Sequence, residues 1–335
     1  MIISQENIQK VLYELFVKYN FTKEKAQLLA SVFTESTLDG VSSHGINRVP
    51  LFIEHIEKGV IKIDAEAEKV ASFGSIERWD GNFGPGIINA TKCTNRAIAL
   101  AKQHGMGLVA LRNTNHWMRG GTYGKQAAEA NCMSILFTNT KPNMPPWGGK
   151  DSRIGNNPFV VSIPREKGNV ILDMAISQFS FGKINDYRLK GEKLPFHGGW
   201  DDNDELSNDP DKILSKERGL PIGYWKGSAL SMVLDMLATI LSAGNSTYRI
   251  SSKDIETGIS QVFICIYPEV FNDSELQEKL MDEIIDYTHN VEPINSEDKI
   301  YYPGERSSQT RTKNLKDGIF VNESIWEKIM LLSKK

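Results

Sequence analysis

The chain of 335 residues lacks several features that would place it in a specialised class of protein. It contains no apolar run near the ~18 residues that a membrane-spanning helix needs. Its N-terminal sequence, MIISQENIQK, has neither the basic nor the apolar region of a signal peptide. Its three cysteines lie far apart and form no CxxC pair, which is typical of reduced thiols (Cys93, Cys132 and Cys265). We therefore expect a cytoplasmic protein without a membrane partner.

Excess positive charge is also missing. The formal net charge is −3 and the sequence pI is about 6.1, so the chain has no general attraction for nucleic acid. The HExxH and GxSxG motifs are absent, so zinc-peptidase and α/β-hydrolase chemistry have no support. What remains is an ordinary globular composition, with 40% hydrophobic and 24% charged residues, and a length that suggests about two domains.

The first sixty residues predict helices. Ile8, Leu12 and Leu15 belong to an apolar stripe with helical spacing behind a capping Ser4, and Thr22 is placed to cap a second helix. A third helix is expected to carry Phe52, Ile53 and Ile56. Because so short a segment cannot bury these stripes alone, we expect the N-terminal helices to take part in a homodimer interface.

The centre of the chain alternates between strand-like and helix-like segments. Strands are expected at residues 60–63, 70–73, 106–111, 134–138, 159–163, 170–174 and 261–266. Helices are expected at 86–104, 122–131, 225–242 and 273–290, with a final helix after Asn322. The segment 225–242 is apolar nearly all round, so we expect it to be buried. This order predicts an α/β centre bracketed by helical termini that pack together.

Three familiar motifs are present only in part. The sequence GMGLVA at 105–110 matches a dinucleotide-binding GxGxxA, but here the glycines follow a helix and lead into a strand, so a helix C-cap at Gly105 is the better interpretation. A phosphate-binding loop at 120–125 is one residue too short. The acidic run at 201–205 has Leu206 where a calcium loop needs glycine, so we interpret it as a solvated loop.

Two polar segments carry residues suited to catalysis. SSHGINR at 42–48 presents His44, which can give a proton near neutral pH, and Arg48, which can hold a carboxylate through two hydrogen bonds. RNTNHWMRGG at 112–121 follows a strand end, where ligands gather in α/β proteins. Taken alone, a His–Arg pair is more often two ordinary exposed residues without a functional role, and the second segment can equally be an irregular loop.

Taken together, these two segments resemble the malate/L-lactate dehydrogenase family that is unrelated to the Rossmann enzymes. The resemblance continues through MPPWGG at 144–149, RIGNNP at 153–158, LDMA at 172–175, GYWKGS at 223–228, GISQ at 258–261 and PGER at 303–306. It spans almost the whole chain and is weakest at 164–168, 200–216 and 243–256.

The resemblance implies an α/β fold with a mixed, mostly antiparallel sheet flanked by helices, a non-Rossmann NAD-binding fold, and a homodimer. We expect residues 1–65 with 285–335 to form a helical domain for dimerisation and substrate binding. Residues 66–284 would then form the NAD-binding domain.

The resemblance also implies a set of site residues. His44 would be the proton donor, with Arg48 and His116 binding the substrate. The cofactor, NADH, would contact Asn169, Val170, Ile171, Leu172, Asp173, Met174, Ala175, Trp225, Lys226, Gly304, Glu305 and Arg306. No metal is expected. Asp173 can accept from ribose hydroxyls, although capping a helix N-terminus is a comparable alternative, and Trp147 is expected in the core.

The function predicted from this resemblance is the NADH-dependent reduction of a small 2-keto sugar acid. Two alternatives stay open: another 2-keto acid as the substrate, as in malate, lactate or ureidoglycolate enzymes, or a sugar-acid binding protein without turnover. The walls of the substrate pocket are not legible in the sequence.

Overall fold

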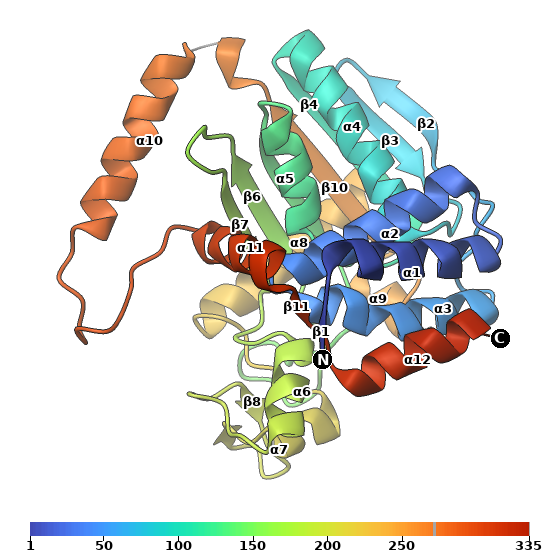
Figure 1. Ribbon diagram of the computed structural model, residues 1–335, viewed down its shortest axis with the longest axis vertical. Coiled ribbons are helices and arrows are strands. Elements are labelled where there is room, and N and C mark those ends of the chain that lie inside the picture. Colours follow the sequence, from blue (N-terminus) through green and yellow to red (C-terminus); the bar gives the residue numbers. More distant parts are fainter. Residues whose placement is uncertain (271–272, 335) are drawn as a thin grey trace.

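The computed structural model describes residues 1–270 and 273–334. Its centre is a seven-stranded sheet in the order β2–β3–β4–β10–β5–β6–β7 (Figure 1). Strands β3 and β4 are parallel, and the other neighbouring pairs are antiparallel, so the expected mixed and mostly antiparallel sheet is confirmed. The strands are β2 (Glu68–Phe73), β3 (Ile76–Asp80), β4 (Met106–Thr114), β5 (Met133–Thr138), β6 (Phe159–Ile163), β7 (Val170–Met174) and β10 (Ile259–Ile266).

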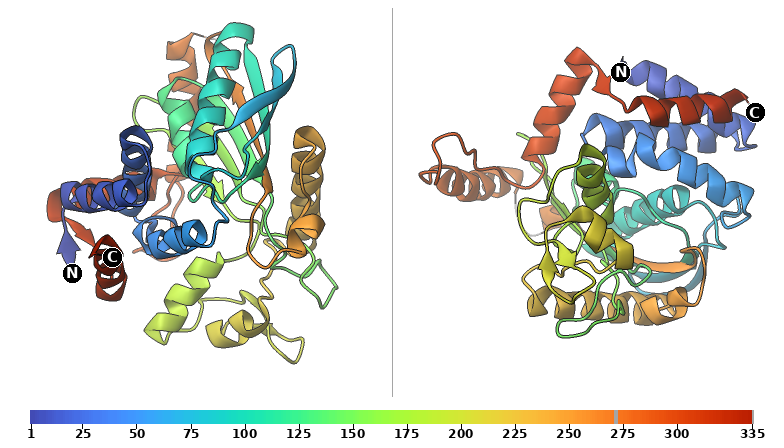
Figure 2. Two further views of the ribbon diagram at one scale, coloured as in Figure 1. Left: turned by 90° about the vertical axis from the view of Figure 1, so that its right-hand side faces the viewer. Right: turned by 90° about the horizontal axis from the view of Figure 1, so that it is seen from below.

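Helices cover both faces of this sheet, as the left view of Figure 2 shows. On one face α4 (Gly86–His104) and α5 (Gly121–Glu129) pack over a core that includes Trp117, Tyr123 and Phe263. On the other face α8 (Trp225–Ser242) packs through Leu234 and Ala238. Burial of these apolar side chains is the main favourable contribution to folding here.

Helices from the two ends of the chain pack together beside the sheet. Helices α1 (Gln5–Lys18), α2 (Lys23–Leu38) and α3 (Val49–Glu57) share a core with α12 (Glu323–Lys334) (Figures 1 and 2). The expected caps are confirmed, because Ser4 and Thr22 accept the backbone N–H groups of Asn7 and Lys25. Strands β1 (Ile2–Ile3) and β11 (Ile319–Phe320) tie the two ends together.

The remaining elements lie around this frame. A small lobe holds α6 (Phe181–Lys190), α7 (Pro210–Lys216) and the strand pair β8 (Gly199–Trp200) and β9 (Leu206–Ser207), with a core that includes Ile184 and Ile213. Helix α9 (Thr247–Ser251) precedes β10, α10 (Ser274–His289) extends away from the body, and α11 (Glu305–Asp317) lies near β7 (Figure 1). No helix of the described residues is long and apolar enough to cross a membrane.

Two predicted local structures are wrong. Residues 60–63 form no strand: Val60 and Ile61 donate to the carbonyl of His55 at the end of α3, and Ile61 is buried in the helical core. Trp147 is not in the core but 46% exposed, because it packs at the surface against Tyr224, with ring centroids 5.1 Å apart.

The predicted burial of 225–242 is also wrong. Helix α8 is the outermost layer on its side of the sheet, so only one of its apolar faces is covered within the chain. Its outer face exposes Met232, Val233, Met236, Leu237 and Ile240. By contrast, the apolar stripes of α1 and α2 are fully buried inside the chain, so they give no reason to place these helices in a dimer interface.

The two motif interpretations that rest on local geometry hold. Gly105 ends α4 with a φ of 84°, and its N–H donates to Ala101, as a helix C-cap does. In the acidic loop, residues 202–205 are exposed as predicted, whereas Asp201 is buried and its Oδ1 accepts the backbone N–H groups of Asn203 and Glu205.

Candidate active site

Two short 3₁₀ turns present His44 and Arg48. The turns Ser42–His44 and Ile46–Arg48 link α2 to α3 and meet at Gly45. A Cβ at Gly45 would lie 2.3 Å from Thr37 Oγ1, so only glycine lets the loop rest against α2. The same hydroxyl accepts the N–H of Ile46 at 2.9 Å. This anchor fixes the loop from which both side chains extend.

The end of β4 presents His116. The amide of Asn115 holds the segment, because its Nδ2 donates to the carbonyls of Phe83 and Gly84 at 2.8 and 2.9 Å. Its Oδ1 accepts from Thr257 Oγ1 at 2.8 Å. Trp117, next in the chain, is buried in the core of the sheet. The segment 112–121, which the sequence analysis singled out for its polar and aromatic residues, therefore holds His116 in a fixed position.

The two histidines lie face to face. Their ring centroids are 5.8 Å apart and their planes differ by 17°. His116 Nδ1 accepts the backbone N–H of Met118 at 2.9 Å, which requires an unprotonated Nδ1. His44 Nδ1 lies 3.1 Å from Ser43 Oγ, a hydroxyl that can either donate or accept. The two rings therefore differ in the protonation states that their neighbours permit.

The histidines mark the junction of two cavities. One, of about 330 Å³, continues from them to Arg48, Lys141, Asn143 and Glu256. The other, of about 190 Å³, continues from them to Arg119, Gly120, Asp173 and Ala175. We call the first the Arg48 cavity and the second the Asp173 cavity. A molecule in each would meet its neighbour beside the histidine rings.

Burial and positive charge keep both histidines neutral near pH 7. Burial, followed by the charges of Arg48 and Arg119, lowers the pKa of His44 to about 4. The pKa of His116 is lowered well below its usual range by burial first and then by Arg48. The Nδ1 lone pair of His116 is occupied by Met118 N–H, so His44 is the ring that can take up a proton without losing a hydrogen-bond partner.

Arg48 has no direct side-chain partner among the described residues. Burial lowers the pKa of its guanidinium, and the charge of Glu256 acts in the opposite direction. Arginine offers a planar pair of donors that suits a carboxylate. A half-buried guanidinium beside two histidines can therefore hold a carboxylate while a proton is transferred nearby.

The segment 169–175 contributes every second residue to the cavities. Asp173 and Ala175 line the Asp173 cavity, and Asn169 and Ile171 line a further cavity of about 250 Å³ that we call the Gly304 cavity. Val170, Leu172 and Met174 line neither, because alternate residues of a strand point to opposite faces. Arg119 lines both cavities and so joins them.

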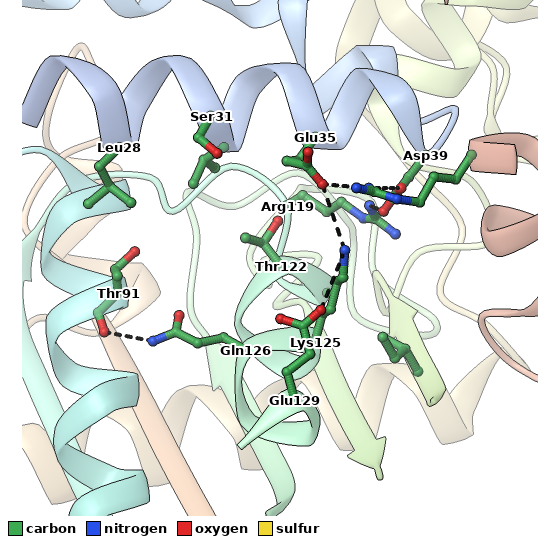
Figure 3. A pocket seen from close by; sticks show the side chains of 14 residues that line it. Leu28, Ser31, Glu35, Asp39, Thr91, Arg119, Thr122, Lys125, Gln126 and Glu129 are labelled. Atoms are coloured by element: carbon green, nitrogen blue, oxygen red, sulfur yellow. Dashed lines mark hydrogen bonds and ion pairs between the residues drawn. The ribbon is translucent and has the colours of Figure 1, made fainter. Parts of the chain in front are cut away.

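An ion-pair network surrounds the Gly304 cavity. Arg119 and Arg311 both pair with Asp39, and Arg311 and Lys125 both pair with Glu35. These groups also line a neighbouring cavity of about 480 Å³ between α2 and α5, where Figure 3 shows Glu35 and Asp39 on one side and Lys125 on the other. Three cations from different parts of the chain thus face Glu35 of α2 and Asp39, the residue that follows this helix.

The other predicted cofactor residues are placed unevenly. Asp173 Oδ2 accepts the N–H of Gly121 at 2.8 Å at the start of α5, so the helix-capping interpretation describes this oxygen. Gly304, with a φ of 97°, begins α11 and lines its cavity, whereas Glu305 accepts from Tyr302 N and Arg306 lies over the ring of Tyr301. Trp225 and Lys226 begin α8 and line none of these three cavities.

Sequence reasoning missed several residues of the Arg48 cavity. Ser43, Thr140, Asn143, Asn156 and Glu256 all line it. Ser43 lies in the turn just before His44, and the other four come from loops next to β5, β6 and β10. Ser43 and Asn156 stand in the motifs SSHGINR and RIGNNP, whereas a position near a strand end is the signal for Thr140, Asn143 and Glu256.

A family model described as malate/L-lactate dehydrogenase matches residues 3–330. The chain belongs to this family and is an oxidoreductase of the type that acts on hydroxy and keto acids. Dehydrogenases of this family imply a nicotinamide cofactor.

Individual relatives agree with this assignment. The chain is 42% identical over 333 residues to a 2,3-diketo-L-gulonate reductase of Salmonella paratyphi A, a match that covers 99% of this chain and 100% of the relative. It is similar in structure to sulfolactate dehydrogenase from Methanocaldococcus jannaschii, with a TM-score of 0.89, 30% identity and coverage of 100% and 97% of the two chains. Malate dehydrogenase from Entamoeba histolytica gives a TM-score of 0.94 at 25% identity, with the same coverage of 100% and 97%.

Proposed function

We propose that this protein reduces the 2-keto sugar acid 2,3-diketo-L-gulonate to 3-keto-L-gulonate with NADH. Its 42% identity to a reductase named for that substrate supports the choice. The observation that carries the proposal is the unpaired Arg48 beside the stacked rings of His44 and His116. In this proposal Arg48 holds the substrate carboxylate, which brings the adjacent keto group to the histidines.

His44 is the proposed proton donor and His116 the group that orients the keto oxygen. Met118 N–H needs the lone pair of His116 Nδ1, so protonating that nitrogen would break a 2.9 Å hydrogen bond. Ser43 can turn its hydroxyl and serve either protonation state of His44 Nδ1. Gaining and losing a proton is therefore easier for His44, whereas a neutral His116 keeps its Nε2–H as a fixed donor.

The nicotinamide cofactor supplies a hydride when it is bound, and the residues around the Asp173 and Gly304 cavities fit it. The start of α11 lines the Gly304 cavity at Gly304, Ser307 and Ser308, together with Arg119, Lys125 and Arg311, an arrangement suited to a pyrophosphate. A Cβ at Gly304 would lie 3.1 Å from Ile171 N, so glycine keeps this turn close to β7. Arg119 Nε is buried without a hydrogen-bond partner among the described residues.

The proposed cofactor set keeps all twelve residues named from the sequence, with unequal support. Asn169, Ile171, Asp173, Ala175 and Gly304 line the two cavities. Support for Trp225 and Lys226, as for the remaining residues, comes from the family resemblance.

NADH is preferred over NADPH in this proposal. Arg119, Lys125 and Arg311 pair with Glu35 and Asp39, and Asp173 lies 3.9 Å from Arg119, so three cations face three carboxylates. The pyrophosphate already brings two negative charges to these cations, and a 2′-phosphate would add about −1.5 to −2 more beside Glu35, Asp39 and Asp173. A kcat/KM with NADPH equal to or above that with NADH would contradict this preference.

The test of the function is the loss of NADH absorbance when 2,3-diketo-L-gulonate is added, measured beside a panel of other 2-keto acids. The proposal expects the highest kcat/KM for 2,3-diketo-L-gulonate. Binding of the sugar acid without any oxidation of NADH would instead identify a binding protein. A higher kcat/KM for oxaloacetate or pyruvate would assign the enzyme to another substrate.

We also propose a cytoplasmic homodimer. All three cysteines of the chain are buried and free, which suits a reducing compartment. The exposed apolar face of α8, which includes Met236 and Ile240, is the surface we propose for the interface, in place of the N-terminal helices. The division into a helical domain (1–65 with 285–335) and a cofactor domain (66–284) remains part of the proposal.

A further inference from the structure

The Arg48 cavity contains a half-buried carboxylate that the proposed chemistry does not use. Glu256 lies in the loop between α9 and β10 and lines the cavity with Arg48 and the two histidines. One of its oxygens, Oε2, accepts the backbone N–H of Lys141 at 2.9 Å. No other hydrogen bond to its carboxylate is found within the described chain. Burial raises the pKa of this carboxyl, whereas the N–H of Lys141 and the charges of Arg48 and Lys141 favour its ionised form. A carboxylate acceptor therefore faces a cavity that is to receive an anionic substrate.

The loop that carries Glu256 is held rigidly. Lys141 Nζ donates to the carbonyls of Lys253 and Asp254 at 2.8 and 3.0 Å. The neighbouring Thr257 donates to Asn115, beside His116. The carboxylate is thus fixed relative to the histidines before any substrate arrives, and a fixed acceptor loses little entropy when it binds a donor.

A second acceptor in the same cavity lacks a partner. Asn143 Nδ2 donates to Asn156 Oδ1 at 3.0 Å, so the donor end of the amide is used. Asn143 Oδ1 is buried and has no hydrogen-bond partner among the described residues. Buried polar atoms are normally satisfied, so an orphan acceptor on a residue that lines a cavity points to a donor on the ligand.

The two acceptors favour some substrate chains and disfavour others. Hydroxyl groups of a polyhydroxylated chain can donate to both. A second carboxylate has no proton to donate near pH 7, and its charge would be repelled by Glu256. Pyruvate has only a methyl group beyond its keto carbon, so it offers neither acceptor a hydroxyl group. Sites built to hydrogen-bond a substrate hydroxyl discriminate strongly against analogues that lack it.

We propose that Glu256 and Asn143 determine specificity: both accept hydrogen bonds from the hydroxyl groups of the substrate chain, and the charge of Glu256 rejects 2-keto acids with a second carboxylate. This inference rests on the proposed function, because it assigns the tail of the substrate to the cavity whose head group Arg48 holds. It explains how Arg48 can bind the carboxylate shared by all 2-keto acids while the enzyme still discriminates among them.

The experiment compares kcat/KM for 2,3-diketo-L-gulonate, oxaloacetate and pyruvate in the wild type and variants. Glu256→Gln keeps an oxygen for Lys141 N–H but removes the charge. We expect the ratio of 2,3-diketo-L-gulonate to oxaloacetate to fall ~10-fold or more, mainly through KM. The matched control is Asp254→Asn, which removes the same charge from an exposed position two residues away and should leave the ratio unchanged.

Asn143→Leu gives an independent arm if Glu256→Gln folds poorly, as circular dichroism and thermal melting would show. Because Asn143 carries no charge, its loss should lower the ratio of 2,3-diketo-L-gulonate to pyruvate and leave the ratio of oxaloacetate to pyruvate unchanged. Equal losses on all three substrates would indicate a purely structural role and overturn the inference alone. A wild type that reduces none of the three, with NADH or NADPH, would overturn the proposed function and this inference together.

Discussion

Raising the pH should slow reduction, because the proposed proton donor loses its proton already at acid pH. Burial and the charges of Arg48 and Arg119 lower the pKa of His44 to about 4. With that pKa, ~1 molecule in 1,000 carries the imidazolium form at pH 7. Reduction needs this form, so log kcat/KM, which reports the free enzyme, should fall about one unit per pH unit above pH 4.

Substrate binding should move this dependence. The carboxylate of a keto acid on Arg48 would neutralise the second cause of the low pKa of His44. Each ~1.4 kcal/mol of repulsion removed raises the pKa by about one unit. The limb of kcat, which reports the enzyme–substrate complex, should therefore lie at higher pH than the limb of kcat/KM. Oxidation of the hydroxy acid needs the neutral ring and should decline only toward acid pH.

The assay is the initial rate of NADH oxidation across pH 5 to 8 in the wild type, His44→Asn and His116→Asn. His44→Asn keeps a hydrogen-bonding group but cannot release a proton, so it should lose ~10²-fold or more in turnover while binding NADH normally. His116→Asn should lose less and keep the pH limb. The reasoning is refuted if wild-type kcat/KM is flat over this range. Near-wild-type turnover in His44→Asn with a lost limb in His116→Asn would reverse the two roles.

Three further predictions follow from the same structure. Arg48→Lys should raise KM for the keto acid with little change in NADH affinity, because lysine lacks the two-pronged geometry; an unchanged KM would remove Arg48 from the substrate site. The apo protein should lose stability as the pH falls from 6.5 to 4, by about 3 kcal/mol from His44, because the unfolded chain takes up a proton that the folded chain refuses, and urea unfolding of His44→Asn should show a smaller loss. Met236→Lys on the outer face of α8 should convert the proposed dimer to a monomer of 37.6 kDa in sedimentation, whereas Leu331→Lys on α12 should not; a wild type that is already monomeric would contradict the dimer.

Local signals in the sequence were sufficient for most helices and strands. Ser4 and Thr22 cap their helices through hydrogen bonds to residues three positions away, so the relevant partners are visible in the sequence. Strand β3 was missed because its five residues, IERWD, carry charges that usually indicate a surface. Glu77 is nevertheless buried there, where it binds the guanidinium of Arg96 and the indole of Trp79.

The residues of the candidate site also divide into those that a local sequence pattern predicts and those that it does not. His44, Arg48 and His116 stand in two compact motifs, so the sequence alone could identify them. The structure adds that the rings of His44 and His116 lie 5.8 Å apart. Glu256 and Asn143 belong to no motif, and more than a hundred positions of chain separate them. What brings them together is the order of β5 and β10 as neighbours in the sheet, which no local pattern encodes.

The charges of the Arg48 cavity connect substrate binding to proton delivery. Before the substrate arrives, Arg48 is balanced by the charge of Glu256, and both histidines are held neutral by burial. A bound monoanion shifts this balance by one negative charge, which favours the imidazolium form of the more readily protonated ring, His44. Reduction of a keto group consumes one proton together with the hydride, so in the proposed reaction the proton enters the site with the molecule that needs it. A neutral keto compound would bring no such charge and would find His44 unprotonated, which is a physical reason for this site to select acids.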